Sequence, residues 1–548
     1  MNTTNGSAGE KRFRYLAEEI RVPVSVGEAG ILNEAKRRMK RRGLDPHTLH
    51  FRLYKRSVDA RDRNEIRFVC TVLAEARNAI PEPLRSRAGL KPLDDREPEI
   101  VRGTERLAAP PLVVGMGPAG LFAALWLAKG GYRPTLIDRG DCVADRVRSV
   151  GLFRTEGILD VESNVQFGAG GAGTFSDGKL VTRIHDPFCR SVLETLYRFG
   201  APEDILVQAK PHIGTDILRN VVDGILAEIQ RLGGTVIYRC RMDGFTELPD
   251  GTVSVQTSRG EISCGAMILA PGHSARDTYR MLIGKQLAIE AKPMSVGVRV
   301  EHLQEEIDRA LYGNFAGHPE LGHAEYALSD TKGARGVYTF CMCPGGEVIA
   351  AASEEGGVVT NGMSNRARDG VNANAAVAVS LSCADYEPVG GSLALGAIAL
   401  QRSIEQAAFR AGGGDYSAPV MTLGDFLAGK SGTEPGRILP SYRAGKTRLS
   451  DFGKVFPGFL CDSLRYAFTS FGKKLEGYDT PDAVLTAAET RTSAPLRILR
   501  SPETLTAIGH DRLYPCGEGA GYAGGITSAA VDGIRVALAL MNRFGGTD

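Results

Sequence analysis

This sequence of 548 residues lacks the features that mark several common classes of protein. Its ten cysteines include no pair of CxxC motifs at zinc-binding spacing, so no metal site is expected. Its formal net charge is only +2, which argues against a global field that would attract nucleic acid or a membrane surface. No run approaches the roughly 18 uncharged apolar residues of a membrane-spanning helix, so no such helix is expected.

An export signal is also missing from the start of the sequence. Residues 1–10 are small and polar, and the basic residues that follow lead into no long apolar core. The scattered cysteines fit reduced thiols better than a disulfide framework. We therefore expect a cytoplasmic protein with no membrane partner.

The most informative stretch of the sequence is 111–140. Gly115, Gly117 and Gly120 form a G-x-G-x-x-G pattern between an apolar run and a helical pattern. In a strand–turn–helix unit these three glycines permit a tight turn, the approach of a pyrophosphate and close helix packing. Asp138 ends the next apolar run, where a carboxylate can accept hydrogen bonds from an adenosine ribose. The stretch predicts a dinucleotide site and, taken alone, leaves NAD and FAD both open.

Two further glycine-rich segments stand elsewhere in the chain. Residues 165–180 hold too many glycines for an ordinary helix or strand, so their backbone amides are free to approach a planar or anionic ligand. A flexible surface loop is the alternative. Near the end, a short apolar run leads into Gly517 and a helix that Gly524 and Gly525 open, about 400 residues after the first turn.

The pattern of apolar residues divides the chain into four parts. Residues 1–100 form a small α+β module, with 21 Lys or Arg against 15 Asp or Glu, which ends in a linker over 76–109. Residues 101–291 alternate between strands and helices, as an α/β domain does. Residues 292–490 change in composition, which indicates an inserted mixed domain. Residues 491–548 return to the alternating pattern of residues 101–291. Within residues 101–291, three strands are expected at 235–241, 252–257 and 262–269.

The combination of two glycine turns at opposite ends of the chain, a meander and an insertion resembles the FAD-binding fold of the glutathione-reductase type. The stretches VVGMGPAGLFAAL, NVQFGAGGAGTFSDGKL and YPCGEGAGYAGGITSAAVDG are similar to those of uncharacterised bacterial FAD-dependent, or NAD(FAD)-utilising, dehydrogenases. The resemblance implies an α/β fold with a Rossmann-like FAD-binding domain, an inserted mixed α+β substrate domain and a small N-terminal α+β module.

The resemblance also implies which residues hold FAD. Glu518 stands where that fold has an aspartate for a ribityl hydroxyl, so the carboxylate is kept with one more methylene. The positive end of the last helix would face the flavin and favour its anionic reduced form. The implied FAD-binding residues are Gly115, Gly117, Pro118, Ala119, Gly120, Asp138, Arg139, Gly170, Gly171, Thr174, Met242, Pro271, Gly272, Gly517, Glu518, Gly524, Gly525 and Ile526.

Three residues are the catalytic candidates: Lys179, Cys343 and Arg491. A flavin carries the hydride chemistry itself, so the protein need only position a substrate and supply a proton. Arg491 could hold a substrate carboxylate or phosphate, with a structural salt bridge to Glu489 as the alternative. His273 could act as an acid or base, although a hydrogen-bonded loop histidine is favoured.

The pair Cys341 and Cys343 invites a redox-disulfide interpretation. In a regular strand two such side chains share a face but lie farther apart than a disulfide normally tolerates. Ordinary packing is therefore favoured for both thiols.

We expect an FAD-dependent oxidoreductase, a dehydrogenase or reductase, that moves a hydride between a small organic substrate and flavin N5. The alternatives are a flavin-dependent monooxygenase or oxidase, and a flavin-containing RNA-binding or regulatory protein. The last depends on the basic cluster at 36–42, where a solvated helix face is favoured and nucleic acid is not the expected partner. NAD(P)H is at most a transient co-substrate, because no second dinucleotide unit is present. The oligomeric state stays open.

Overall fold

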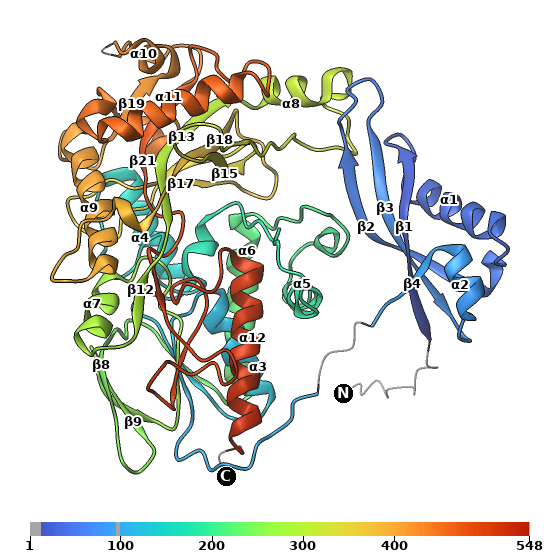
Figure 1. Cartoon of the computed structure of the whole chain (residues 1–548), viewed down its shortest axis with the longest axis horizontal. Coiled ribbons are helices and arrows are strands. Elements are labelled where there is room, and N and C mark those ends of the chain that lie inside the picture. Colours follow the sequence, from blue (N-terminus) through green and yellow to red (C-terminus); the bar gives the residue numbers. More distant parts are fainter. Residues whose placement is uncertain (1–11, 95–98, 431, 547–548) are drawn as a thin grey trace.

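The structure is a computed structural model that describes residues 12–94, 99–430 and 432–546. A small N-terminal module stands to one side of a larger body, and that body contains a parallel sheet and a larger mixed sheet (Figure 1). The fold is thus mixed α/β, as the sequence predicts. Among these residues no helix combines the length and the apolar character needed to cross a membrane.

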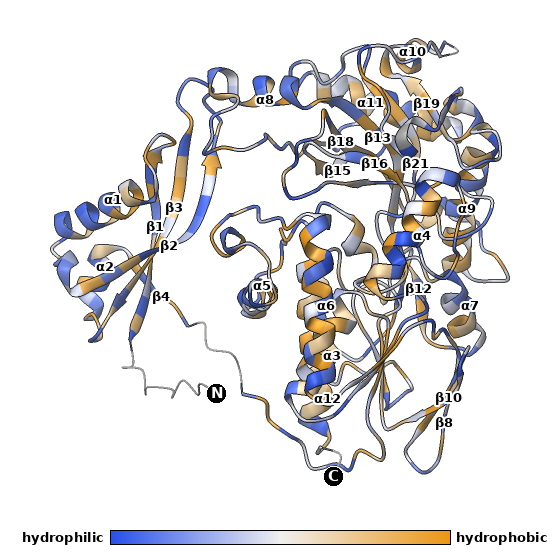
Figure 2. Ribbon diagram, turned by 180° about the vertical axis from the view of Figure 1, so that it is seen from behind, coloured by the Kyte–Doolittle hydropathy of each residue, from blue (hydrophilic) through white to orange (hydrophobic). Residues whose placement is uncertain are grey.

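The N-terminal module is a four-stranded antiparallel sheet in the order β2-β3-β1-β4. One face of α1 packs on it through Ile31, Ala35 and Met39, and the opposite face of this helix is largely hydrophilic (Figure 2). The elements are β1 (Phe13–Pro23), α1 (Glu28–Arg41), β2 (Leu49–Asp59), β3 (Arg67–Ala76), α2 (Glu82–Ala88) and β4 (Leu90–Pro92).

The expected linker over 76–109 is wrong for its first part. Helix α2 and strand β4 lie within it, and β4 pairs with β1. The reason is that Ala88 and Leu90 are buried in the core of the module, which the high density of charged and proline residues around them conceals.

The module docks on the main body through β2, which is an edge strand of its sheet. The amide of Arg56 donates to the Val207 carbonyl at 2.6 Å, and the amide of Ala209 donates to the Arg56 carbonyl at 2.9 Å. The Arg56 guanidinium also pairs with Glu320 at 2.9 Å. The exposed edge of β2 is therefore covered in part by the main body.

The main body is centred on a five-stranded sheet in the order β23-β11-β5-β6-β7, in which all neighbouring strands are parallel. Helix α3 is buried on all sides, and α12 lies beside it (Figures 1 and 2). Gly533 permits this approach, since a Cβ there would lie 2.1 Å from the Ala119 carbonyl oxygen. The elements are β5 (Leu112–Val114), α3 (Pro118–Lys129), β6 (Thr135–Ile137), α4 (Val143–Glu156), α5 (Phe188–Arg198), α6 (Thr215–Arg231), β7 (Thr235–Ile237), β11 (Met267–Leu269), β23 (Leu513–Pro515) and α12 (Ile526–Arg543).

The region 235–269 holds five strands where the sequence predicts three. The first and last of them belong to the parallel sheet, and the middle three form a separate antiparallel sheet, β10-β9-β8. The extended conformation is interrupted after β7 at Arg239, whose φ is +52°. It is interrupted again at Gly265, where a Cβ would lie 2.5 Å from the Ala109 carbonyl oxygen. The middle strands are β8 (Met242–Glu247), β9 (Val253–Thr257) and β10 (Gly260–Cys264), and helix α7 (Arg276–Gly284) follows β11.

The inserted region is built on a seven-stranded sheet in the order β14-β15-β18-β13-β21-β19-β20. Its central strands, β13 and β18, are buried almost throughout, and the alanine-rich stretch near 371–380 forms β18. The elements are β12 (Ile289–Ala291), β13 (Met294–Leu303), α8 (Gln304–Tyr312), β14 (Ser329–Asp330), β15 (Val337–Cys343), β16 (Glu347–Ala350), β17 (Thr360–Met363), β18 (Asn372–Leu381), α9 (Leu393–Ala411), β19 (Ala418–Thr422), α10 (Leu423–Ala428), β20 (Thr447–Leu449), α11 (Gly458–Gly472), β21 (Val484–Glu489) and β22 (Leu496–Ile498).

Candidate functional site

A cavity of about 310 Å³ lies where the parallel sheet meets the inserted sheet. Its walls come from the turn after β5, the second glycine loop, the turn after β11, the start of α12 and strands β15, β17 and β21. The predicted site residues that line it are Gly115, Gly117, Pro118, Ala119, Asp138, Gly171, Lys179, Pro271, Gly272, Arg491, Glu518, Gly524, Gly525 and Ile526.

The turn after β5 needs its glycines for the reasons expected. Gly115 has a φ of +102°, and a Cβ there would lie 2.1 Å from the Ala270 carbonyl oxygen. At Gly120 a Cβ would lie 1.8 Å from the Gly115 carbonyl oxygen, so this glycine seats α3 against the turn and does not line the cavity. Gly117 caps α3 without a side-chain hydrogen bond, so the first amides of this helix stay available to an anion.

The second glycine loop packs directly on this turn. Gly171 has a φ of +62°, and a Cβ there would lie 2.8 Å from the Gly117 Cα. Behind it, the Thr174 hydroxyl donates to the Ala169 carbonyl at 3.3 Å, and a Cβ on Gly170 would lie 2.0 Å from the Thr174 oxygen. Gly170 and Thr174 therefore shape the loop from inside and do not line the cavity.

Arg146 of α4 holds the second glycine loop in shape. Its side chain is completely buried and donates to five backbone carbonyls of the loop and its approach. Its guanidinium also lies over the Phe175 ring, 4.8 Å from the centroid. The acceptors are the carbonyls of Asn164 at 2.8 Å, Val165 at 2.9 Å, Gly168 at 3.3 Å, Ala169 at 2.7 Å and Gly171 at 2.9 Å.

Asp138 lines the cavity and joins the two glycine segments. Its carboxylate accepts from the amides of Met116 at 2.8 Å, Gly140 at 2.8 Å and Gly168 at 2.9 Å. A carboxylate has about four acceptor positions, so this network leaves room for one further donor. Asp138 is thus a clamp between the turns as well as a candidate ribose acceptor.

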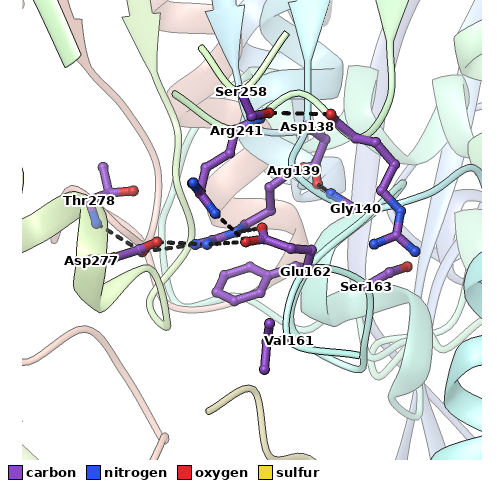
Figure 3. A network of polar contacts seen from close by, with 12 residues as sticks. Asp138, Arg139, Gly140, Val161, Glu162, Ser163, Arg241, Ser258, Asp277 and Thr278 are labelled. Carbon is purple, nitrogen blue, oxygen red and sulfur yellow. Dashed lines mark hydrogen bonds and ion pairs between the residues drawn. The ribbon is translucent and has the colours of Figure 1, made fainter. Parts of the chain in front are cut away.

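Arg139, which the sequence places among the cofactor residues, does not line the cavity. It pairs with Glu162 at 2.7 Å and with Asp277 at 2.6 Å, and Arg241 reaches the same Glu162 carboxylate (Figure 3). Burial alone would lower the pKa of Arg139, but its hydrogen bonds to the carboxylates of Asp277 and Glu162 outweigh that effect and raise the pKa. Arg139 therefore links the segment around Glu162 to α7, which carries Asp277.

Three glycines of the cavity wall, one after β11 and two at the start of α12, have free space beside them. A Cβ on Gly272, Gly524 or Gly525 would meet no atom within 4 Å.

Burial raises the pKa of Glu518 to about 7, against the opposing effects of Lys292 and the Gly525 amide. This carboxyl therefore changes charge near neutral pH.

The inserted region contributes Phe340, Cys341, Asn361 and Glu489 to the cavity wall, and Asn361 comes from β17, which pairs with β16 outside the seven-stranded sheet. The completely buried Arg299 stands behind them and organises them. It donates to Glu489 at 2.9 and 3.0 Å, to the Asn361 side chain at 3.0 Å and to the Cys341 carbonyl at 2.8 Å. This part of the wall is consequently preorganised by one guanidinium.

Lys179 reaches the cavity from the second glycine loop and sits among opposite charges. Its ammonium lies 3.4 Å from Glu325 and 3.7 Å from Asp177. Arg368 closes the group with ion pairs to both carboxylates, at 2.8 and 2.5 Å. Burial alone would lower the pKa of Lys179, but the two carboxylates outweigh it and raise that pKa. Lys179 therefore keeps its positive charge at neutral pH.

Arg491 also lines the cavity, but its donors are engaged in a buried network. It pairs with Glu405 at 3.1 Å, and Arg276 of α7 pairs with the same carboxylate at 2.7 Å. The salt bridge considered from the sequence, between Arg491 and Glu489, is absent among the described ion pairs because Glu489 pairs with Arg299. Arg491 thus ties β21 to α9, since Glu405 lies on α9.

His273 lies on the cavity wall next to Ser274, whose hydroxyl is 3.0 Å from the ring Nδ1. Burial, reinforced by the charges of Arg491 and Arg276, lowers the pKa of His273 to about 4. The imidazole is therefore neutral at physiological pH.

Three other predicted residues lie behind the wall. Met242 starts β8 in an apolar core, and Cys343 is buried behind Cys341. The Gly517 amide donates to Asp532 at 2.7 Å, and a Cβ there would lie 2.5 Å from the Ala119 Cβ.

Some cavity residues are absent from the predicted set: Gln166, Phe167, Ser274, Phe340, Asn361 and Thr492. Two of them, Gln166 and Phe167, lie within the second glycine-rich segment, 165–180, where proximity to its glycines is a usable signal. The others come from β15, β17 and the segments that follow β11 and β21, and only the tertiary fold brings them to the cavity.

Comparisons with known proteins bear on this site. Residues 293–492 match a family described as FAD-dependent protein, C-terminal domain-like, and the cofactor of this chain is accordingly FAD. An uncharacterised protein of Clostridium beijerinckii is 46% identical over 498 residues, which cover 90% of this chain and 92% of that protein.

Two solved structures are distantly similar to this chain. The crystal structure of CtdE in complex with FAD has a TM-score of 0.30 and 11% identity, and covers 78% of this chain and 84% of that one. NikD, an unusual amino acid oxidase essential for nikkomycin biosynthesis, has a TM-score of 0.32 and 13% identity, with 80% and 94% covered. Likenesses at this level carry no argument about reaction or substrate.

Proposed function

Since this chain belongs to the same family as the Clostridium beijerinckii protein, and its cofactor is FAD, we propose that it is an FAD-dependent oxidoreductase that acts on a small organic substrate. The observation that carries the proposal is the cavity itself. It joins two glycine turns from opposite ends of the chain to side chains of the inserted sheet. A dinucleotide cofactor and a substrate would then meet at one place.

The residues present fit FAD. Gly117 and Gly171 leave backbone, and no side chains, facing the cavity where α3 begins, which suits a pyrophosphate. Asp138 has one acceptor position left for a ribose hydroxyl. Glu518 and the uncapped start of α12 offer a carboxyl and backbone amides at the other end. We infer an arrangement of the glutathione-reductase type, which the parallel sheet and the neighbouring three-stranded sheet support.

In this proposal, residues 101–291 and 491–548 form the FAD-binding domain and residues 292–490 the substrate domain. FAD supplies hydride acceptance and donation at its N5 atom. The substrate lies against Phe340 and Asn361, on the side of the cavity that the inserted region provides. NAD(P)H, if it is the reductant, enters the same cavity as a transient co-substrate.

The titratable residues of the cavity have separate roles in this proposal. Lys179 holds a fixed positive charge that stabilises negative charge developing on substrate or cofactor. It is a poor proton donor at neutral pH because its carboxylate partners hold its proton. Glu518, which titrates near neutral pH, is better matched to proton transfer, and the neutral His273 can accept a hydrogen bond.

The proposal is tested by anaerobic reduction with candidate substrates. Protein reconstituted with FAD is mixed with small amino, hydroxy and carboxylic acids and with NAD(P)H, while the visible absorption of the flavin is followed. If one class of compound bleaches the flavin, that class contains the substrate or the reductant. Lys179→Met should slow bleaching by an anionic substrate, whereas Lys179→Arg should retain most of the rate. A purified protein that takes up no FAD would refute the proposal.

A further inference from the structure

We propose that Cys341 and Cys343 form a redox-active pair that exchanges two electrons with FAD bound in the cavity. The inference depends on the proposed function, because it assigns a second electron-carrying group to the same site. Three observations carry it: an irregular strand that brings the thiols together, the unequal exposure of the two thiols and the positive charges that face them.

The strand that carries the pair is not regular. Along β15 the register with β18 advances from Phe340 opposite Ala376 to Cys343 opposite Asn374, so three steps on one strand face two on the other. Cys341 itself has a φ of +46°, which a non-glycine residue rarely adopts without a local reason. The assumption of an extended strand, which favoured ordinary packing, therefore does not hold at this place.

The bulge brings the two residues into direct contact. The Cys343 thiol donates to the Cys341 carbonyl, with 3.3 Å between sulfur and oxygen. Gly362 of β17 lies close to the Cys343 sulfur, since a Cβ on this glycine would lie 2.9 Å from that sulfur. Both thiols are reduced in the structure.

The two thiols differ in their access to the cavity. Cys341 is half-buried and lines the cavity wall, whereas Cys343 is completely buried behind it. This order gives the pair one sulfur that reaches the cavity contents and one that is protected from them. A thiol placed for packing alone would have no need of a cavity face.

Positive charge favours the thiolate of the exposed member. The hydrogen bond from Cys343 lowers the pKa of Cys341, and Arg299 and Lys179 lower it further against the effect of burial. The same hydrogen bond, together with burial, raises the pKa of Cys343. Thiolate at Cys341 beside thiol at Cys343 is the protonation state from which a dithiol reacts most readily.

The step is balanced within the protein and its cofactor. The Cys341 thiolate and the Cys343 thiol together give up two electrons and one proton, and a sulfur–sulfur bond forms between them. FAD takes up these two electrons, and the proton from Cys343 with one from solvent completes its reduction. The reverse direction cleaves the disulfide and returns both electrons to the pair.

The first test counts electrons. FAD-loaded protein is oxidised with ferricyanide, freed of oxidant and titrated anaerobically with dithionite. The wild type should take up a second pair of electrons per flavin, and both Cys341→Ser and Cys343→Ala should take up only one pair. Cys383→Ser removes another half-buried thiol, which lies by the Ala291 carbonyl and does not line the cavity, and should behave as the wild type.

The second test needs no bound flavin. Apoprotein treated with diamide is alkylated and digested, and the peptide that contains both thiols is weighed. A peptide lighter by two hydrogens and free of alkyl groups is expected. Alkylation of both thiols would overturn the proposal.

The outcomes separate this proposal from the function on which it depends. A protein that binds FAD and takes up only the electron pair of the flavin overturns the dithiol and leaves the oxidoreductase standing. A protein that takes up no FAD overturns both.

Discussion

Gly171 packs so closely on Gly117 that a Cβ on Gly171 would lie 2.8 Å from the Gly117 Cα. These glycines lie more than fifty positions apart and belong to separate motifs, yet they make one surface of the cavity. Glycine is needed at 171 for space and also for its φ of +62°. The relationship is the basis of the first prediction.

Gly171→Ala should weaken FAD binding by at least about tenfold, or ~1.4 kcal/mol, because the turn and the loop must separate to admit the methyl group. The dissociation constant is measured by quenching of FAD fluorescence on titration of apoprotein. Gly151→Ala is the matched control: this glycine lies inside α4, and a Cβ there would meet no atom within 4 Å. Equal affinities for the two variants would contradict the prediction.

Arg146→Met should destabilise the apoprotein by at least ~3 kcal/mol, since several buried carbonyls lose their donor together. The variant should also be purified with little FAD, because the second glycine loop loses its internal support. Urea unfolding and flavin content are the measurements. Arg148→Met, on the same helix but exposed and paired with Asp145, should stay within ~0.5 kcal/mol of the wild type.

Glu405→Gln should cost about 3–5 kcal/mol, because Arg276 and Arg491 then lose their shared buried counter-charge. Burial would raise the pKa of Glu405, but the two guanidiniums outweigh it and lower that pKa well below its ordinary value of 4.5. Its stabilising effect is thus fully present above about pH 4.5 and is lost as the pH falls.

Chemical unfolding at pH 7 and at lower pH checks this expectation. The gap between wild type and Glu405→Gln should narrow on acidification, and a gap that is independent of pH would count against it. Glu355→Gln, at an exposed position in the segment before β17, serves as the control and should change stability little.

Glu518 should show the opposite dependence on pH. Its folded pKa of about 7 lies above the ordinary value of 4.5, so the folded apoprotein binds one more proton than the unfolded chain between these values. The contribution of Glu518 to stability therefore falls as the pH rises from about 4.5 to 7. Glutamine does not titrate, so Glu518→Gln should gain stability relative to the wild type over this interval.

Urea unfolding of both apoproteins at pH 5 and pH 8 measures this change. If the difference between them is the same at the two pH values, Glu518 is not a neutral-range titrating group. Glu503→Gln, on the exposed segment after β22, controls for general effects of removing a carboxylate.

Local sequence was sufficient for those parts of the site that depend on neighbouring residues. Gly115, Gly117 and Gly120 act within one turn, and their spacing alone indicates their positions against β5 and α3. The apolar pattern likewise predicts most helices, because a buried face repeats along a single segment. The expected strand at 262–269 spans parts of both β10 and β11, because the short break between them leaves the apolar pattern almost unchanged, and the expected strand at 235–241 ends before β8.

Partners that are distant in the sequence could not be predicted in this way. Arg146 is one arginine among several on α4, and only the fold shows that it is the buried one. Glu405 was not a candidate because its arginine partners stand far from it along the chain. The bulge at Cys341 has no sequence signature of glycine or proline, so a regular strand was the natural assumption.

The docking of β2 on segment 207–209 has a consequence for communication within the molecule. Three residues further on, His212 forms a bridge with Lys179, and the Leu180 amide donates to the Pro211 carbonyl at 2.9 Å. One short segment of backbone, residues 207–212, thus pairs with the N-terminal module at one end and with Lys179 of the cavity at the other. A ligand or partner that displaces the module would shift this segment. We therefore expect binding at that remote surface to change the position of the Lys179 ammonium group.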